Sequence, residues 1–335
     1  MPLSYISILR SLSIIVVVIF HTYGYMYAQA HFPESVSIYH QHYFWINQCV
    51  IIWPAMAMFT MMAGYLFNHL YERGKYRQFG LFCKKKAMRL LIPFFVFGLL
   101  MMLTTGVGVS PLRLLQGGIS HLWYLPALFW CFIVAWLLKR YVSSLSVMVV
   151  ITSGCLALPL VGKFIPMVLG LHYLSIWLGW FLLGMILSLI SERIQGGGIK
   201  QLSIISTGLI FAMIYVFQQW IYPVEYADVT WYLTITLVLV TTGVFAMVYT
   251  IREKGIRFCQ PLIWMSKYAF GIFIFHNWIG PYLISRTAKS LLPLETWASD
   301  YVILFPLCLT VTILFISWFF TWVALKTRLG RLLLS

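Results

Sequence analysis

Residues 8–21 read ILRSLSIIVVVIFH, an apolar run with an arginine near one end and a histidine at the other. Arg10 and His21 are 11 residues apart, which is three helical turns, so a helix places them on one face about 16 Å apart along its axis. The apolar character continues to residue 28, which is long enough to cross a bilayer. The stretch therefore predicts a membrane-spanning helix that carries ionisable groups at two depths.

The composition of the whole chain excludes an ordinary soluble protein. Of its 335 residues, 61% are hydrophobic, 18% are aromatic and 9% are charged. A soluble domain is about 45–50% apolar and about 25% charged, and a disordered chain needs low hydrophobicity and high charge. We expect one transmembrane domain over residues 1–335, with no soluble domain.

Apolar stretches of spanning length recur along the chain and predict an all-α, polytopic membrane protein with about ten transmembrane helices. The stretches are 7–28, 43–66, 87–105, 121–138, 145–162, 170–190, 201–221, 230–250, 261–284 and 301–325.

The basic residues support this count, because Lys and Arg are retained on the cytoplasmic side of a membrane. With ten spans and both termini cytoplasmic, 19 of the 23 Lys and Arg fall inside, and the outside keeps only Arg113, Lys163, Arg286 and Lys289. The net charge of +15 is then a consequence of topology, and no nucleic-acid partner is expected.

The first span has an alternative interpretation. Arg10, the apolar run and Ala28-Gln29-Ala30 together imitate a secretory signal whose cleavage would leave His31 at the mature N-terminus. Charge counting cannot decide between the two, because the other nine spans keep the same orientation.

The six cysteines are scattered singly, without a Cys-x-x-Cys pair or metal-ligand spacing. We interpret them as small core residues and expect no metal site and no permanently bound cofactor.

Polar residues inside predicted spans are the first candidates for function, because they are costly in a bilayer. His276, in the outer half of the ninth span, lies at roughly the depth of His21, whereas Ser266 and Lys267 lie near that span's inner end. Alternatively, Arg10 is a lipid anchor and His21 a core histidine bonded to a neighbouring helix. No Asp or Glu falls deep in a span, which argues against a carboxylate proton relay.

A basic cluster precedes the third span and ends in Lys86 and Arg89, three residues apart at a predicted helix start. Residues at this spacing share a face. They could anchor the protein to anionic lipid or bind an anionic cytosolic ligand such as a nucleotide phosphate. On the outer side, His121, Trp123 and Tyr124 open the fourth span. An aromatic belt at the membrane interface explains Trp123 and Tyr124 without any function.

Taken together and in order, these motifs resemble the acyltransferase-3 family of integral membrane acyltransferases. The family's Arg and His of the first helix correspond to Arg10 and His21, and its Phe-x-x-Ser-Gly-Phe/Tyr motif is approximated by residues 59–65. The basic-x-x-Arg…Pro motif matches Lys86, Arg89 and Pro93. The His-Leu-Trp-Phe/Tyr-Leu motif matches 121–128, and the late Ser-Lys…His pattern fits 266–276.

Two features depart from the family pattern. Ala63 stands where the family usually has Ser, so we expect no essential hydroxyl at that turn. The hydrolase-like domain that some members carry is not expected here, so the acceptor should be recognised by the membrane domain and its loops, or by a partner.

The resemblance implies transfer of an acyl group, usually acetyl from acetyl-coenzyme A, from the cytoplasmic side to a hydroxyl of a cell-surface glycan in a bacterial cytoplasmic (inner) membrane. His21 and Arg10 would be the catalytic residues, with His21 as general base or as the site of an acyl-enzyme. The donor would bind Lys86, Arg89, Lys267 and Ser266, and the acceptor His121, Trp123, Tyr124 and His276.

Three questions stay open at this point. The main alternative function is a transporter of a polysaccharide or lipid-linked intermediate, and another alternative is a different acyl donor. Membrane lipid, acyl-coenzyme A and the glycan are the expected partners, and a homo-oligomer stays open beside a single chain.

Overall fold

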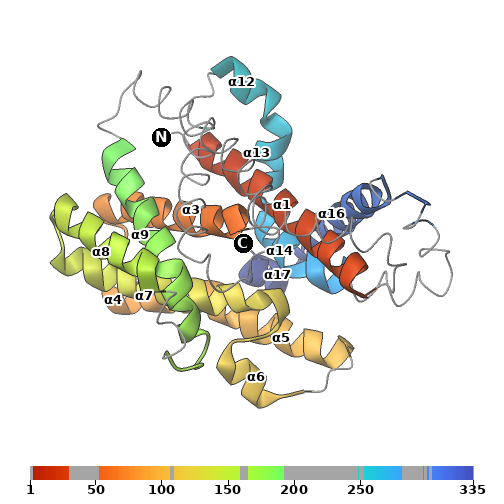
Figure 1. Cartoon of the computed structure of the whole chain (residues 1–335), viewed down its shortest axis with the longest axis horizontal. Coiled ribbons are helices and arrows are strands. Elements are labelled where there is room, and N and C mark those ends of the chain that lie inside the picture. The colour runs from red at the N-terminus through yellow and green to blue at the C-terminus, as the bar shows by residue number, and fades with distance from the viewer. Residues whose placement is uncertain are drawn as a thin grey trace, which may run out of the picture. The chain divides into compact units, whose positions relative to one another are not determined.

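The computed structural model describes residues 3–29, 53–105, 109–158, 165–191, 248, 253–280, 297, 300–301 and 304–334. These residues form helices and turns without a strand, which confirms the all-α class (Figure 1). The chain groups into two compact units. Unit 1 comprises Met1, Ala57–Ile199 and Leu332–Ser335, and unit 2 comprises Pro2–Met56 and Lys200–Arg331. The single domain over 1–335 stays a prediction.

Unit 1 contains most of α3 and the helices that follow it to residue 191. In chain order they are α3 (Trp53–Glu72), α4 (Phe79–Lys86), the π-helix η2 (Ala87–Leu91), α5 (Ile92–Thr105), α6 (Pro111–Gln116), the 3-10 helix η3 (Ser120–Trp123), α7 (Tyr124–Tyr141), α8 (Leu145–Ala157), the 3-10 helix η5 (Leu171–Tyr173) and α9 (Leu174–Ser191).

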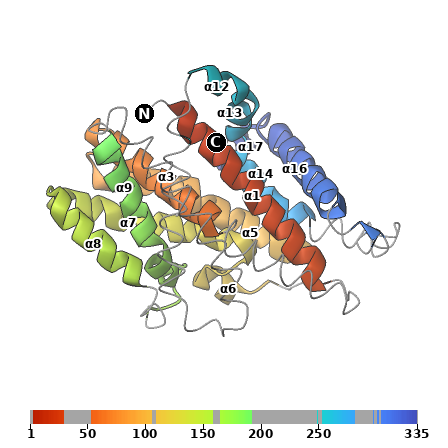
Figure 2. The ribbon, with the colours of Figure 1, turned by 45° about the horizontal axis from the view of Figure 1, so that its top comes forward.

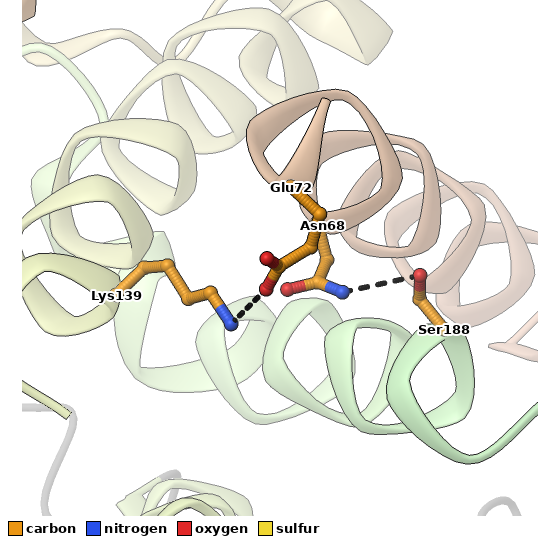
Figure 3. Close-up of polar contacts among 4 residues, drawn as sticks. All are labelled: Asn68, Glu72, Lys139 and Ser188. Carbon is orange, nitrogen blue, oxygen red and sulfur yellow. Dashed lines mark hydrogen bonds and ion pairs between the residues drawn. The ribbon is translucent and has the colours of Figure 1, made fainter. Parts of the chain in front are cut away.

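Polar contacts bring the C-terminal ends of α3, α7 and α9 to the same end of unit 1. Glu72 forms an ion pair with Lys139 at 2.6 Å, and the Asn68 amide donates to the Ser188 hydroxyl at 3.2 Å (Figure 3). The sequence predicts these three helix ends on the same side of the membrane, and the contacts agree with that relative arrangement. Which side is cytoplasmic stays a prediction.

Two glycines allow α3 and α9 to pack backbone to backbone. A Cβ atom at Gly64 would overlap the Phe181 carbonyl, and a Cβ atom at Gly184 would overlap the Met61 carbonyl. Small residues let membrane helices approach closely. In lipid no hydrophobic effect drives helices together, so dispersion contacts between them stabilise the pair. The glycine of the 59–65 motif is therefore explained by packing.

Unit 2 is built around α1 (Leu3–Gln29), which packs along α13 (Gln260–Ser266), α14 (Ala269–Trp278) and α16 (Leu304–Ala324) (Figure 2). The short helices α12 (Glu253–Phe258) and α17 (Arg328–Leu334) complete the described elements. The Ser11 hydroxyl donates to the Leu262 carbonyl at 2.6 Å. Cβ atoms at Gly271 and Gly280 would meet Thr321 and Ile313, so α14 and α16 are antiparallel, as expected for consecutive spans.

Five described helical stretches are long and apolar enough to span a membrane: Ser4–Thr22, Phe79–Thr104, Ser120–Tyr141, Leu171–Leu189 and Leu307–Ala324. The predicted span 201–221 and all of 230–250 except Val248 lie outside the described residues, so the total of ten stays a prediction.

Two spans differ from their predicted form. The third begins at Phe79 instead of residue 87, so the lysine run lies inside the helix. The ninth is broken, because a turn at Lys267–Tyr268 separates α13 from α14.

Candidate functional site

The residues predicted to form the site are distributed over both units. Unit 2 carries Arg10, His21, Ser266, Lys267 and His276, and unit 1 carries Lys86, Arg89, His121, Trp123 and Tyr124. Each group is described within its own unit.

The clearest cluster is a pair of imidazoles in unit 2. The ring centroids of His21 on α1 and His276 on α14 are 5.0 Å apart, with the ring planes at 56°. Phe20 lies edge-on to His21 at 4.9 Å, and Phe273 lies 6.0 Å from His276. His276 is buried and His21 is partly exposed. The depth estimate from the sequence is therefore correct for this pair.

The hydrogen bonds of His276 define which of its nitrogens is basic. Its Nδ1 lies 2.8 Å from the Phe273 carbonyl and 3.1 Å from the Ile272 carbonyl. A carbonyl oxygen can only accept, so Nδ1 carries the hydrogen and Nε2 is the basic nitrogen of the neutral ring. The backbone of α14 thus fixes the tautomer and the orientation of this imidazole.

The other unit 2 residues lie along α1 and at the break between α13 and α14. Arg10 and His21 lie on one uninterrupted helix, as predicted, and both are partly exposed. Ser266 is buried, whereas Lys267 is exposed with its Nζ 5.1 Å from the ring centroids of Trp264 and Tyr268. Cation–π contacts of this kind orient an exposed ammonium group without neutralising it.

In unit 1, Lys86 lies in a box of aromatic rings. Its Nζ is 3.5 Å from the ring centroid of Phe132, 5.3 Å from that of Tyr76 and 5.6 Å from that of Phe82. Phe67 stacks on Tyr76 at 5.7 Å with the planes at 11°. We call Tyr76, Phe82 and Phe132 the aromatic box.

Tyr76 is held in the aromatic box by its own backbone. The Trp136 indole N–H donates to the Tyr76 carbonyl at 2.8 Å, which ties the turn after α3 to α7. Burial raises the pKa of the Tyr76 phenol above its ordinary value, although Arg89 opposes the shift. The ring is therefore neutral, and its attraction for Lys86 is a cation–π interaction.

Arg89 lies on the π-helix that follows Lys86, and its side chain is exposed. Pro93 explains this irregularity, because proline lacks an N–H and its ring clashes with the carbonyl four residues earlier, here that of Arg89. The Ile92 N–H bonds to the Ala87 carbonyl in the i→i+5 pattern of a π-helix. From the sequence, Lys86 and Arg89 are expected to bind phosphate in the same way. In the structure, the Lys86 ammonium lies over the Phe132 ring, whereas the Arg89 side chain is exposed.

The third group lies at the N-terminal end of α7. His121 is buried on η3, and Tyr124 forms a buried hydroxyl–hydroxyl hydrogen bond of 3.1 Å with Thr60. The centroid of Trp123 is 4.6 Å from that of Tyr173 and 5.7 Å from that of Trp177. Trp123 thus uses part of its ring to pack η3 against α9.

Sequence reasoning missed the aromatic box and the Thr60–Tyr124 bond. The three rings of the aromatic box come from the turn before α4, from α4 and from α7, so no local periodicity in the sequence marks them. Pro93, four residues after Arg89, is the signal that could have predicted the π-helix.

Comparison with known proteins gives one match. A family model described as an acyltransferase domain matches residues 3–322, which include all three groups of residues above. No curated protein and no solved structure gives a significant match.

Proposed function

The chain belongs to the acyltransferase-3 family, and we propose that it transfers an acetyl group from cytoplasmic acetyl-coenzyme A to a hydroxyl of a cell-surface glycan. Family membership supports acyl transfer in general. The donor, the acceptor and the bacterial inner membrane as location are the proposed refinements. The contact between His21 and His276 is the observation that carries the proposal, because acyl transfer to a hydroxyl needs a base.

In the proposed reaction His21 acts as general base. It accepts the proton of the acceptor hydroxyl while that oxygen attacks the thioester carbonyl carbon. The new C–O bond forms, the C–S bond breaks, and the imidazolium returns its proton to the coenzyme A thiolate. An imidazole suits both steps because its unperturbed pKa of about 6.5 lies near neutral pH. The partial exposure of His21 supports access for both reactants.

His276 is proposed to orient His21 and to share its positive charge in the transition state. A buried imidazole with a fixed tautomer supports this role, because its Nε2 has a lone pair to offer to a neighbouring N–H. The arrangement follows the general logic of a base that is oriented by a third group. This assigns His276 to the reaction itself rather than to acceptor recognition alone.

Arg89 is proposed as the principal contact for the donor phosphates in unit 1. Its exposed guanidinium can form bidentate bonds to a phosphate, and exposed Lys84 and Lys85 add positive charge nearby. Lys86 already directs its ammonium group at the ring of Phe132, so we give it a positioning role. Arg10, Ser266 and Lys267 remain proposed contacts of unit 2, Arg10 as a catalytic residue and the other two for the donor.

His121, Trp123 and Tyr124 are proposed to recognise the acceptor. Trp123 is partly exposed and lies in a cluster with Tyr173 and Trp177, which supports a stacking surface for a sugar ring. The Tyr124 hydroxyl is satisfied by Thr60, which favours a structural contribution from Tyr124.

The test is donor turnover by the purified chain in nanodiscs, followed as release of free coenzyme A thiol. We expect thiol release from acetyl-coenzyme A that requires both the protein and a membrane extract containing the surface glycan, with radiolabelled acetyl recovered on the glycan.

Two outcomes would contradict the proposal. Thiol release with no labelled glycan would mean that the acceptor is wrong, although the chain is an acyltransferase. Movement of glycan across proteoliposomes without thiol release would instead support a transporter. A parallel assay with succinyl-coenzyme A tests the acyl specificity.

A further inference from the structure

The segment between α5 and α7 does not behave as the water-exposed loop that its position between two spans predicts. α5 ends at Thr105, and α6 packs beside α5. The Ser110 N–H lies 3.4 Å from the Met102 sulfur, and a Cβ at Gly98 would lie 3.2 Å from Leu114 Cδ2 and 2.8 Å from Ile119 Cδ1. Residues 110–119 therefore run alongside the last turns of α5.

This contact places the segment relative to the candidate span that contains α5. Gly98 lies six residues before Thr104, where the candidate span Phe79–Thr104 ends, which corresponds to about 9 Å along a helix axis. Leu114 and Ile119 contact α5 at that level. His121 follows Ile119 by two residues and lies on η3, which also packs against α5.

The segment presents apolar side chains outward. Leu112 and Leu115 on α6 are 62% and 61% exposed, and Met167 and Val168 of the loop before α9 are 60% and 59% exposed. The Leu169 N–H donates to the Leu115 carbonyl at 2.6 Å, so the two stretches are neighbours. We call Leu112, Leu115, Met167 and Val168 the apolar patch.

Several backbone groups around the apolar patch are satisfied by internal hydrogen bonds, as polypeptide that contacts hydrocarbon requires. The Gly170 N–H donates to the Gln116 carbonyl at 2.9 Å, and the Gly117 N–H to the Arg113 carbonyl at 3.1 Å. The Trp130 indole N–H donates to the Leu169 carbonyl at 3.0 Å, and the Ser110 side chain caps α6. Gly117 and Gly170 have positive φ angles of 78° and 70°, which permit this close pairing of two turns.

We propose that α6 and the loop at 165–168 form a re-entrant element whose apolar patch docks on the hydrocarbon chains of one bilayer leaflet. The patch continues the lipid-facing surface of α5, where Leu103 is 60% exposed. Arg113, the one charged residue of α6, is exposed and can extend its guanidinium to the headgroups. The element holds His121 at the depth of the leaflet instead of in an aqueous loop.

Nitroxide accessibility tests the proposal directly. The six native cysteines are replaced, single cysteines are introduced as Leu112→Cys, Leu115→Cys or Val168→Cys, and spin labels are attached in phosphatidylcholine and phosphatidylglycerol vesicles. Collisions with oxygen, which dissolves in lipid, are compared with collisions with a water-soluble nickel chelate. Leu103→Cys is the matched lipid control, and Lys75→Cys, in the exposed turn after α3, is the water control.

We expect all three patch positions to favour oxygen as Leu103→Cys does, with the ratio of the two collision rates inverted relative to Lys75→Cys. Ratios like that of Lys75→Cys would overturn the proposal, because the patch would then face water. Labels that are immobile and shielded from both reagents would also overturn it, because a protein surface would then cover the patch. Oxygen preference is measured without turnover, so failure of the proposed enzymatic function leaves this test unaffected.

Discussion

The two units differ in the surroundings that they give to a pair of ionisable residues. In unit 2, His21 and His276 come from distant parts of the sequence and meet at 5.0 Å between ring centroids. In unit 1, Lys86 and Arg89 are three residues apart, yet one ammonium lies in an aromatic box and the other side chain is exposed on a π-helix. Equal predicted depth thus anticipates the contact of the unit 2 pair, whereas the spacing of Lys86 and Arg89 does not anticipate their different exposure. We propose that the unit 2 pair carries the chemistry and that the unit 1 helix binds the donor phosphates.

The largest expected effect is on the unit 2 pair itself. His21→Gln keeps a side chain that can hydrogen-bond but cannot take up the hydroxyl proton, so thiol release should fall by about 10²–10⁴-fold. Initial rates of thiol release at saturating acetyl-coenzyme A measure this. His69→Gln, on α3 of unit 1, is the matched control and should keep its activity. Activity of His21→Gln close to wild type would make His21 a packing residue.

His276→Asn should have a smaller effect on turnover. The Asn amide nitrogen can still donate to the backbone carbonyls that hold Nδ1, but the basic Nε2 is lost. We expect kcat to fall by roughly tenfold, which is less than the ~10²–10⁴-fold fall expected for loss of a general base. The KM for the donor should be unchanged. A change only in the KM for the acceptor would indicate that His276 contributes to acceptor recognition and not to the reaction itself.

Alanine at two glycines compares the rigidity of the two units. Gly64→Ala places a methyl group against the Phe181 backbone carbonyl, which cannot move alone, and should cost about 1–3 kcal/mol of stability. Gly271→Ala meets the Thr321 side chain and should cost less.

Gly80→Ala is the control for these two substitutions, because no atom lies within 4 Å of its Cβ position. Unfolding by sodium dodecyl sulfate in mixed micelles ranks the three variants. Equal losses for Gly64→Ala and Gly80→Ala would mean that the α3–α9 contact is not tight.

Arg89→Ala should weaken the binding of acetyl-coenzyme A by about tenfold, which is the loss of one charge-assisted phosphate contact. Arg89→Lys should recover only part of the affinity, because lysine cannot form the bidentate pair. Isothermal titration calorimetry at two salt concentrations measures both variants against Lys75→Ala. An equal loss in Lys75→Ala would reduce the role of Arg89 to general basic charge.

The smallest expected effect concerns the aromatic box. Phe132→Leu keeps apolar volume but removes the ring beneath the Lys86 ammonium, so stability should fall by about 0.5–2 kcal/mol. A double-mutant cycle with Lys86→Met, by detergent unfolding, isolates the Lys86–Phe132 coupling. Donor affinity that falls as far in Lys86→Met as in Arg89→Ala would show that Lys86 contacts phosphate after all.

Much of this arrangement could be predicted because it follows from regular helices in a bilayer. The uninterrupted α1 places Arg10 and His21 at two depths, and His276 was expected at the level of His21 from its position in the ninth span. The directions of α3, α7 and α9 also follow from the alternation of basic loops. Each of these inferences needs only a fixed rise per residue and a fixed membrane thickness.

The parts that escaped prediction are those where the helix is irregular or the contact is tertiary. Pro93 is accompanied by a π-helix over Ala87–Leu91, which the α-helical spacing of Lys86 and Arg89 did not predict. Lys86 lies inside the span with its ammonium group over the rings of Tyr76, Phe82 and Phe132, and those rings share no sequence pattern. Residues 110–119 pack along α5 because Gly98 leaves room for them and because the turns at Gly117 and Gly170 pair with each other. A hydropathy profile does not detect these contacts.

Parallel measurement of donor binding and donor turnover in His21→Gln and Arg89→Ala tests the division of roles most directly. We expect His21→Gln to bind acetyl-coenzyme A with wild-type affinity and to release almost no thiol. Arg89→Ala should bind the donor more weakly, yet turn it over at close to the wild-type rate when the donor is saturating. Loss of donor binding in His21→Gln, or loss of saturated turnover in Arg89→Ala, would contradict this division of roles.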